Sequence, residues 1–407
     1  MGGLIARDKE MSKAHSRQNK LKQVLILHSE GNSFNNPTLK CIIDLLLEKN
    51  CEIDLRYGQS DAPMPNNYAA VHFLPFGEKL KKRKYRLFEQ SCSGLRVFLA
   101  ILLERLVCNK KYDLIIGVDR HGLIEANVFN KITKIPYVFI SFEIMFEDET
   151  SARYKSLERV AAKNVAAWIV QDEVRAAHLQ RENYLDPAKK ILLPVASAGV
   201  GVAADDRLRD SLGIPLDKKV AIVIGSVSKW AMTNQIIRSV VFWPEEWVLV
   251  VHDRYGRTRE LLAGELADFS DLLGSKIFIS DAATELVDDM GGILAGVSAG
   301  LALYQPEHGG SRYEGKNLAY LGLSSGKIST YLRYGIPVII NEVGLYAEEA
   351  RQFRFGCVVQ QPEQISDCLN EISHEEYRHN AEDYFANKLD FNNYRDEIWH
   401  RFESLVA

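Results

Sequence analysis

Continuous apolar runs alternate along the chain with amphipathic segments. Residues 23–27 (QVLIL) form such a run, and a short polar loop follows it. A run of this kind is typical of a strand buried on both faces of a parallel sheet. Pro37 then opens an amphipathic segment that ends near Leu47, and residues 51–55 are again apolar at alternate positions. This order predicts a strand, a helix and a second parallel strand, which together make a βαβ unit.

The same alternation continues as far as residue 197. Further strands are predicted at residues 112–119, 136–143, 166–172 and 189–195, each separated from the next by a segment with helical spacing of apolar residues. We therefore predict that residues 21–197 form one doubly wound α/β domain.

A stretch of small residues, ASAGVGVAADD, follows this domain and suits a linker. The strand pattern then restarts, with predicted strands at residues 218–226, 245–253, 276–281, 299–306 and 336–341. These strands predict a second α/β domain at residues 198–388. Apolar residues at helical spacing predict that residues 389–407 form a helix that packs back on the N-terminal domain. The polar residues 1–20 are predicted to be a mobile tail.

Length and composition agree with a two-domain globular protein. The 407 residues exceed what one core usually supports, and 46% are hydrophobic and 26% charged. A net charge of −4 argues against a nucleic-acid-binding protein that works through overall positive charge. The six cysteines show no C-x-x-C or zinc-site spacing, which indicates reduced thiols in a cytoplasmic protein.

A basic run at residues 79–86 precedes an apolar segment at residues 95–107. The apolar segment contains Glu104 and Arg105 and is shorter than the ~20 residues that span a bilayer. Two interpretations remain open. The charges are solvated beside a core helix, or residues 79–107 make a peripheral contact with an anionic membrane surface or a lipid-linked acceptor.

The segment from Asn317 to Asn341 carries the most informative pattern. Ser324, Ser325 and Gly326 precede a predicted helix that has Lys327 in its first turn. The unpaired amides and the dipole at a helix start attract phosphate, whereas a cation there is unfavourable by ~0.3–1 kcal/mol. The placement of Lys327 thus indicates that it meets an anion. The alternative is a serine cap on a surface helix with a solvated lysine.

This segment resembles the donor-site helix of the retaining GT-B glycosyltransferases, the glycosyltransferase group 1 or family 4-like enzymes. The positions that match their P-x-K-x-x-E-Y-L-x-x-G-x-P-V-I pattern are Lys327, Tyr331, Leu332, Gly335, Pro337, Val338 and Ile339. The resemblance implies two Rossmann-like domains that face a cleft. It also implies that the C-terminal domain binds a nucleotide-sugar donor and that the sugar is transferred with retention.

The sequence departs from this family at several places. Two glutamates separated by seven residues, which contact the donor in the family, are replaced by Gly322 and Thr330. Gly225 and Ser226 stand where the family has glycine and arginine, and Lys229 takes the place of a later lysine. The expected donor-binding residues are Gly225, Ser226, Lys229, Arg312, Lys316, Asn317, Ser324, Ser325, Gly326, Lys327 and Tyr331, with Arg312 or Lys316 adding positive charge.

Three polar residues follow predicted strands of the N-terminal domain. Asp119 and His121 lie just past one strand end, and Glu143 lies past the next. Polar residues at these ends of an open sheet face the cleft, where they could bind or deprotonate an acceptor hydroxyl. We therefore take Asp119, His121 and Glu143 as candidate catalytic residues, although each also suits a structural role.

Together these observations predict a hexosyltransferase-like enzyme of polysaccharide biosynthesis. It would transfer a sugar from a nucleoside diphosphate sugar to a hydroxyl of a glycan, polysaccharide or lipid-linked acceptor. No metal or cofactor is expected, since the acidic run DDRLRD lies in the linker and no D-x-D faces the cleft. A sugar-nucleotide epimerase and an inactive glycosyltransferase-like partner protein remain alternatives. A nicotinamide dehydrogenase is disfavoured because no G-x-G-x-x-G follows either first strand.

Overall fold

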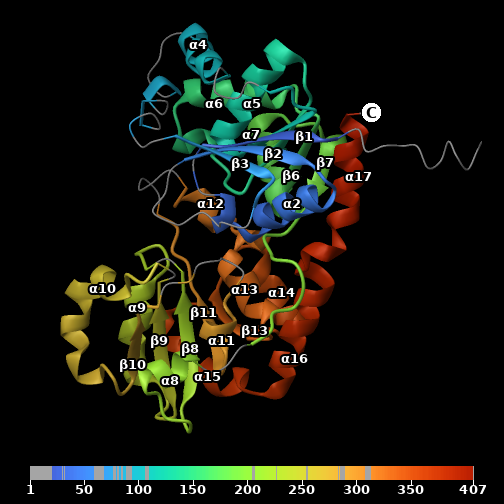
Figure 1. The fold of residues 1–407 in the computed structure, drawn as a ribbon. Helices are drawn as coiled ribbons and strands as arrows, with labels where there is room; N and C mark the ends of the chain where they lie inside the picture. The colour runs from blue at the N-terminus through green and yellow to red at the C-terminus, as the bar shows by residue number, and fades with distance from the viewer. Residues whose placement is uncertain are drawn as a thin grey trace, which may run out of the picture.

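The computed structural model describes residues 21–406, apart from residues 30, 32, 59–67, 77–78, 80–81, 84–85, 89–93, 106–109, 204–206, 226, 254, 283, 285–288 and 308–312. Two α/β units lie one above the other, each built around its own sheet (Figure 1). The two doubly wound domains expected from the sequence are therefore confirmed. The tail expected at residues 1–20 lies outside the described residues.

The first unit has a parallel sheet of seven strands among its described residues, in the order β3-β2-β1-β4-β5-β6-β7. Its strands are β1 (Gln23–His28), β2 (Glu52–Gly58), β3 (Val71–Phe76), β4 (Leu114–Val118), β5 (Tyr137–Ile140), β6 (Ala167–Val170) and β7 (Lys190–Leu192). Its helices are α2 (Pro37–Glu48), α4 (Gly94–Arg105), α5 (Asp119–Thr133), α6 (Ala152–Ala162) and α7 (Glu173–Asn183). Strand β3 was not predicted from its sequence. It contains Pro75, which a strand tolerates at the edge of a sheet.

The second unit has a parallel sheet of six strands among its described residues, in the order β10-β9-β8-β11-β12-β13. Its strands are β8 (Lys219–Ile224), β9 (Trp247–His252), β10 (Ile277–Ser280), β11 (Val297–Ala302), β12 (Val338–Asn341) and β13 (Gly356–Val359). Its helices are α8 (Arg207–Leu212), α9 (Thr233–Ser239), α10 (Thr258–Leu266), α11 (Gly291–Leu294), α12 (Lys316–Ala319), α13 (Gly326–Arg333), α14 (Leu345–Phe353), α15 (Ile365–Ile372) and α16 (Glu375–Tyr384).

The continuous apolar runs are explained by burial on both faces of each sheet. Along β1, Val24 and Ile26 contribute to one apolar cluster, whereas Leu25 and Leu27 contribute to another on the opposite face. Helices cover both faces, so no side of the strand meets water. Within the part of the chain that the structure describes, no helix is long and apolar enough to cross a membrane.

The C-terminal helix α17 (Arg395–Leu405) lies against the first unit rather than the second (Figure 1). Its buried residues Ile398, Trp399 and Phe402 share an apolar cluster with Ile42 and Leu46 of α2. The chain therefore links the two units twice, once near residue 197 and once before α17. Both connections lie on the side of the molecule away from β10 (Figure 1).

Candidate active site

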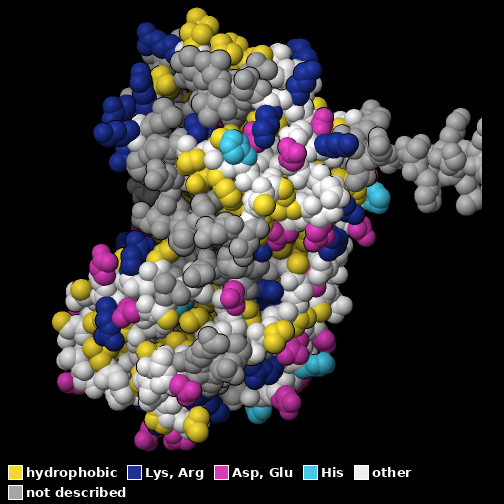
Figure 2. All heavy atoms as spheres, viewed as in Figure 1, with side chains coloured by type: hydrophobic (Ala, Val, Ile, Leu, Met, Phe, Trp, Pro, Cys, Tyr) yellow, Lys and Arg dark blue, Asp and Glu magenta, His cyan; other side chains and the backbone are white. Residues whose placement is uncertain are grey.

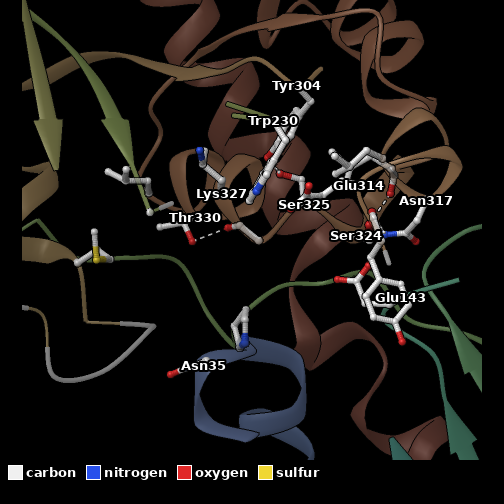
Figure 3. Close-up of a pocket in the computed structure, with 18 of the residues that line it drawn as sticks. Asn35, Glu143, Trp230, Tyr304, Glu314, Asn317, Ser324, Ser325, Lys327 and Thr330 are labelled. Atoms are coloured by element: carbon white, nitrogen blue, oxygen red, sulfur yellow. Dashed lines mark hydrogen bonds between the residues drawn. The ribbon is translucent and has the colours of Figure 1, made fainter. Parts of the chain in front are cut away.

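A cavity of about 490 Å³ lies between the two units, beyond the carboxyl ends of the central strands (Figure 3). Ligands of doubly wound sheets bind at this place. From the first unit, Asn35, Pro37 and Glu143 line it. The described residues that line it from the second unit are Ile224, Gly225, Trp230, Tyr255, Met290, Tyr304, Tyr313, Glu314, Asn317, Leu318, Leu321, Ser324, Ser325, Gly326, Lys327 and Thr330.

One end of this cavity is formed by the start of α13. Ser325 caps the helix, because its Oγ accepts a hydrogen bond from the amide of Ile328 (3.1 Å) and lies 2.6 Å from the hydroxyl of Tyr304. The next two amides, at Gly326 and Lys327, donate no hydrogen bond to any described residue. Two amides at the positive end of the helix dipole are therefore available to an anion.

Lys327 adds a buried positive charge beside these amides. Its Nζ is buried and has no hydrogen-bond partner among the described residues. The ring of Tyr304 lies 5.8 Å from Nζ, and burial lowers the pKa of this lysine to about 8. A buried cation without a partner is unfavourable, as is a cation in the first turn of a helix. The arrangement therefore favours an anion in the cavity.

An aromatic wall stands beside Lys327. The rings of Trp230 and Tyr304 are stacked, with centroids 6.0 Å apart and an angle of 11° between the ring planes. Asn341 fixes the backbone of Tyr304, because its side chain accepts from the Tyr304 amide (2.9 Å) and donates to the Tyr304 carbonyl (2.7 Å). Figure 3 shows the wall between Lys327 at one end of the cavity and Glu143 at the other.

Tyr331 does not line the cavity but lies beneath the Lys327 end, where its hydroxyl contacts the end of strand β8. The side chain is fully buried. Its hydroxyl donates to the carbonyl of Ile222 (2.9 Å) and accepts from the amide of Ile224 (2.9 Å), at the end of β8. The expected direct contact of Tyr331 with the donor is therefore wrong. Its role is to fix the strand end that precedes Gly225.

The other end of the cavity carries the Glu143 carboxylate. Asp119 does not line the cavity but holds the loop that carries Glu143, since its Oδ1 accepts from the amides of Phe142 (2.7 Å) and Glu143 (3.0 Å). Asp119 adopts a positive φ of 53°, which an aspartate tolerates better than most residues. We therefore assign Asp119 a positioning role and keep Glu143 as the candidate catalytic residue.

The expectation that His121 faces the cleft is wrong. His121 lies in the first turn of α5 and is 1% exposed, inside the first unit. Its ring is 5.6 Å from the ring of Tyr154 and 5.0 Å from the ring of Phe88, between centroids. Helix α5 begins at residue 119, so the side chain of His121, two positions later, points away from the end of the strand.

Two of the expected cations are neutralised by acidic side chains. Lys316 forms an ion pair with Asp148 of the first unit, and its amide donates to Glu149 (2.8 Å). The Nζ of Lys229 lies 2.6 Å from Oε1 of Glu307, and the Lys229 side chain is 75% exposed. Neither residue lines the cavity, so their expected contacts with the donor are not supported. Ser226 and Arg312 lie outside the described residues.

The remaining candidates do come together. Gly225, Asn317, Ser324, Ser325, Gly326 and Lys327 all line the cavity. Sequence reasoning missed Trp230, Tyr304 and Glu314. Trp230 follows the strand predicted at residues 218–226, so the carboxyl-end rule could have found it. Tyr304 was placed inside the strand predicted at residues 299–306, but the observed strand β11 ends at Ala302. It also missed Asn35. The side-chain Nδ2 of Asn35 donates a hydrogen bond to the hydroxyl of Tyr255 (3.0 Å) and so joins the two units.

The structure explains one departure from the glutamate pair. Gly322 has φ of 50°, and a Cβ at this position would lie 2.1 Å from Oδ2 of Asp172. The same oxygen accepts a hydrogen bond from the amide of Leu323 (2.9 Å), so it cannot easily move away. Any side chain at residue 322 would therefore collide with the first unit. Thr330, at the second position of the pair, does line the cavity.

One domain-family model matches part of the chain. Residues 294–391 match the model of a domain family described as the C-terminal domain of glucosyltransferase 3-like proteins. No curated protein matches the chain by sequence.

Several solved structures are similar over nearly the whole chain. HepE of Anabaena in complex with UDP and glucose has a TM-score of 0.69 at 12% identity, over 94% of this chain and 100% of HepE. Sucrose-phosphate synthase of Thermosynechococcus elongatus has a TM-score of 0.68 at 12% identity, over 94% and 99%. WaaG, a glycosyltransferase involved in lipopolysaccharide biosynthesis, has a TM-score of 0.61 at 14% identity, over 93% and 98%. The two parallel sheets and these similarities show that the chain has the GT-B fold.

Proposed function

We propose that this protein is a glycosyltransferase that takes a sugar from a nucleoside diphosphate sugar bound in the cavity between its two units. The observation that carries the proposal is the buried ammonium of Lys327, which has no hydrogen-bond partner among the described residues and lies beside two available amides. A diphosphate supplies the negative charge and the oxygen acceptors that this end of the cavity needs. The match to a glucosyltransferase 3-like domain covers this helix and supports the assignment.

We place the donor and the acceptor along the cavity, which has a volume of about 490 Å³. In this proposal the diphosphate contacts Lys327 and the start of α13, and the sugar extends along Trp230 and Tyr304 toward Glu143, all of which line the cavity. The bond between the sugar C1 and the diphosphate oxygen breaks, and C1 bonds to the acceptor oxygen on the face from which the diphosphate leaves, as retention requires. The Glu143 carboxylate takes the acceptor proton, and the nucleoside diphosphate leaves. Positive charge at Lys327 and the helix dipole stabilise the negative charge that develops on the leaving group.

The finer parts of the function rest on resemblance. UDP-glucose is the proposed donor, because the structure of HepE was determined with UDP and glucose. Retention at C1 is proposed from the resemblance to the retaining enzymes, and a glycan, polysaccharide or lipid-linked molecule is the proposed acceptor. That no metal or cofactor is required stays a prediction.

A contact with an anionic membrane surface is part of this proposal. In the described part of residues 79–107, α4 exposes Leu95 (64%) and Leu99 (47%) next to the exposed Arg96. Figure 2 shows hydrophobic side chains at the α4 end of the molecule and lysine and arginine side chains around them. Apolar residues ringed by cations suit the interface of an anionic bilayer. Such a contact would bring the cavity near a lipid-linked acceptor and hold the protein at the cytoplasmic face.

A panel of nucleotides tests the proposed donor class. We expect UDP or another nucleoside diphosphate to raise the melting temperature, because a ligand at one hundred times its Kd adds about 2.7 kcal/mol of stability. For domains of this size, that corresponds to roughly 5–10 °C. NAD should give no shift. A shift with NAD and none with any nucleoside diphosphate or nucleotide sugar would remove the proposal. A shift with the nucleotide but no sugar transfer to any acceptor would favour the inactive partner protein.

A further inference from the structure

Asn317 joins the two units at the Glu143 end of the cavity. It lies in α12 of the second unit, where it is buried. Its Oδ1 accepts a hydrogen bond from the amide of Ile144 in the first unit (2.8 Å), and its Nδ2 donates to the Glu143 carboxylate. The side chain of one unit thus contacts both the backbone and the carboxylate of the loop that carries Glu143.

Arg175 holds Asn317 in this orientation. It belongs to α7 of the first unit and is fully buried. Its guanidinium donates to Oδ1 of Asn317 (3.1 Å), to the carbonyl of Phe142 (2.7 Å) and to the carbonyl of Tyr320 in the second unit (2.9 Å). Because Oδ1 already accepts from Arg175 and Ile144, the amide of Asn317 must turn its Nδ2 toward Glu143.

We propose that Asn317 is a positioning residue that aims the Glu143 carboxylate into the cavity, and that Arg175 fixes Asn317 for this task. Glu143 is then correctly oriented when the two units have the relative position seen here. The catalytic carboxylate of the first unit is set by a side chain of the donor-binding unit. This inference rests on the proposed function of Glu143.

The substitution Asn317→Asp separates this role from a structural one. Aspartate has the same shape, and its Oδ1 still accepts from Ile144 and from Arg175. The change removes the donor toward Glu143 and puts a second carboxylate beside it. It also removes the hydrogen bond from Nδ2 to the carbonyl of Tyr313 (3.4 Å). A structural role that rests on the contacts with Ile144 and Arg175 would survive the substitution. Positioning of Glu143 would not, since two like charges in contact repel each other.

The test measures kcat for UDP release from UDP-glucose, with water as the acceptor, and the Kd for UDP. For Asn317→Asp we expect kcat to fall by about 10–100-fold, of the order seen for a misplaced catalytic group, and Kd to change less than about threefold. In the Glu143→Gln background, Asn317→Asp should lower kcat by less than about twofold, because the two changes act on the same step. Asn380→Asp, at a half-buried asparagine whose side chain donates to the carbonyl of Arg354, is the matched control and should leave kcat unchanged.

The outcomes separate this inference from the proposed function. Normal turnover by Asn317→Asp overturns this inference but not the proposed function. The same holds if Asn317→Asp lowers kcat equally in the unchanged protein and in the Glu143→Gln variant. UDP binding without release of UDP from UDP-glucose by the unchanged protein also overturns it, since Glu143 then has no reaction to serve. If the unchanged protein binds no nucleoside diphosphate, the proposed function is overturned, and this inference falls with it. If Asn317→Asp does not fold, Asn317→Ala removes the same donor without adding charge and is expected to lower kcat in the same range.

Discussion

Replacing Lys327 with methionine is expected to weaken UDP binding by about one to two orders of magnitude. The substitution keeps most of the aliphatic side chain but removes the ammonium, and a hydrogen bond to a charged group contributes about 1.5–3 kcal/mol. Isothermal titration measures the difference directly. Lys229→Met is the matched control, because Lys229 is exposed and paired with Glu307 outside the cavity. Its Kd for UDP should equal that of the unchanged protein.

The same substitution should stabilise the protein when no ligand is bound. Burial lowers the pKa of Lys327 to about 8, from an ordinary value of 10.5. Below pH 8 the folded protein must keep this buried group charged, which costs up to about 3 kcal/mol. Between pH 8 and pH 10.5 the unfolded chain binds more protons than the folded one, so the free energy of unfolding rises with pH. Relative to Lys327→Met, the unchanged protein should therefore gain stability across that window.

Proton uptake links the two effects. A bound diphosphate raises the pKa of Lys327, so binding near pH 8.5 should take up a fraction of a proton. Titrations in two buffers of different ionisation enthalpy measure that uptake, and Lys327→Met should show none. Equal affinities of the two proteins for UDP, with no proton uptake by either, would contradict the assignment of the anion site.

Replacing Glu143 with glutamine is expected to lower kcat by about 10²–10⁴-fold while the Kd for UDP stays nearly unchanged. General base catalysis typically contributes this much, and the glutamine amide cannot take up a proton. Glu143 lies at the opposite end of the cavity from Lys327 (Figure 3), so nucleotide binding should not need it. Steady-state kinetics and isothermal titration together measure both quantities. Glu348→Gln, on the exposed side of α14, is the control.

Two results would contradict this role for Glu143. If Glu143→Gln loses nucleotide binding while its fold is intact, the donor lies at the other end of the cavity. If kcat is unchanged, the acceptor is activated by another group. In either case the assignment of donor and acceptor ends would need to be revised.

The architecture was predictable because strand burial leaves a strong local signal. The runs at residues 24–27 and 220–224 are apolar at consecutive positions, and each belongs to the first strand of its unit, which lies inside a parallel sheet. Strand β3 escaped prediction because its proline and its edge position weaken that signal. The start of α13 was predictable for a similar reason. Ser325, Gly326 and Lys327 are neighbours in sequence, and one helix start brings them together.

The Glu143 end of the cavity depends on contacts between distant residues, which no local pattern reveals. The pairing of Lys316 with Asp148 joins residues 168 positions apart and removes a cation that sequence alone assigned to the donor. Arg175 looks like an ordinary polar residue of an amphipathic helix, yet it is fully buried between the two units. His121 was misassigned because the helix starts at residue 119 and directs it into the core.

Determination of the structure in the presence of saturating UDP tests the central claim most directly. We predict density for the diphosphate within hydrogen-bond distance of Lys327 Nζ and of the amides of Gly326 and Lys327. The path from the diphosphate toward Glu143 should remain open for a sugar. Density for UDP elsewhere, or a cavity without nucleotide at a concentration well above the Kd, would contradict the claim.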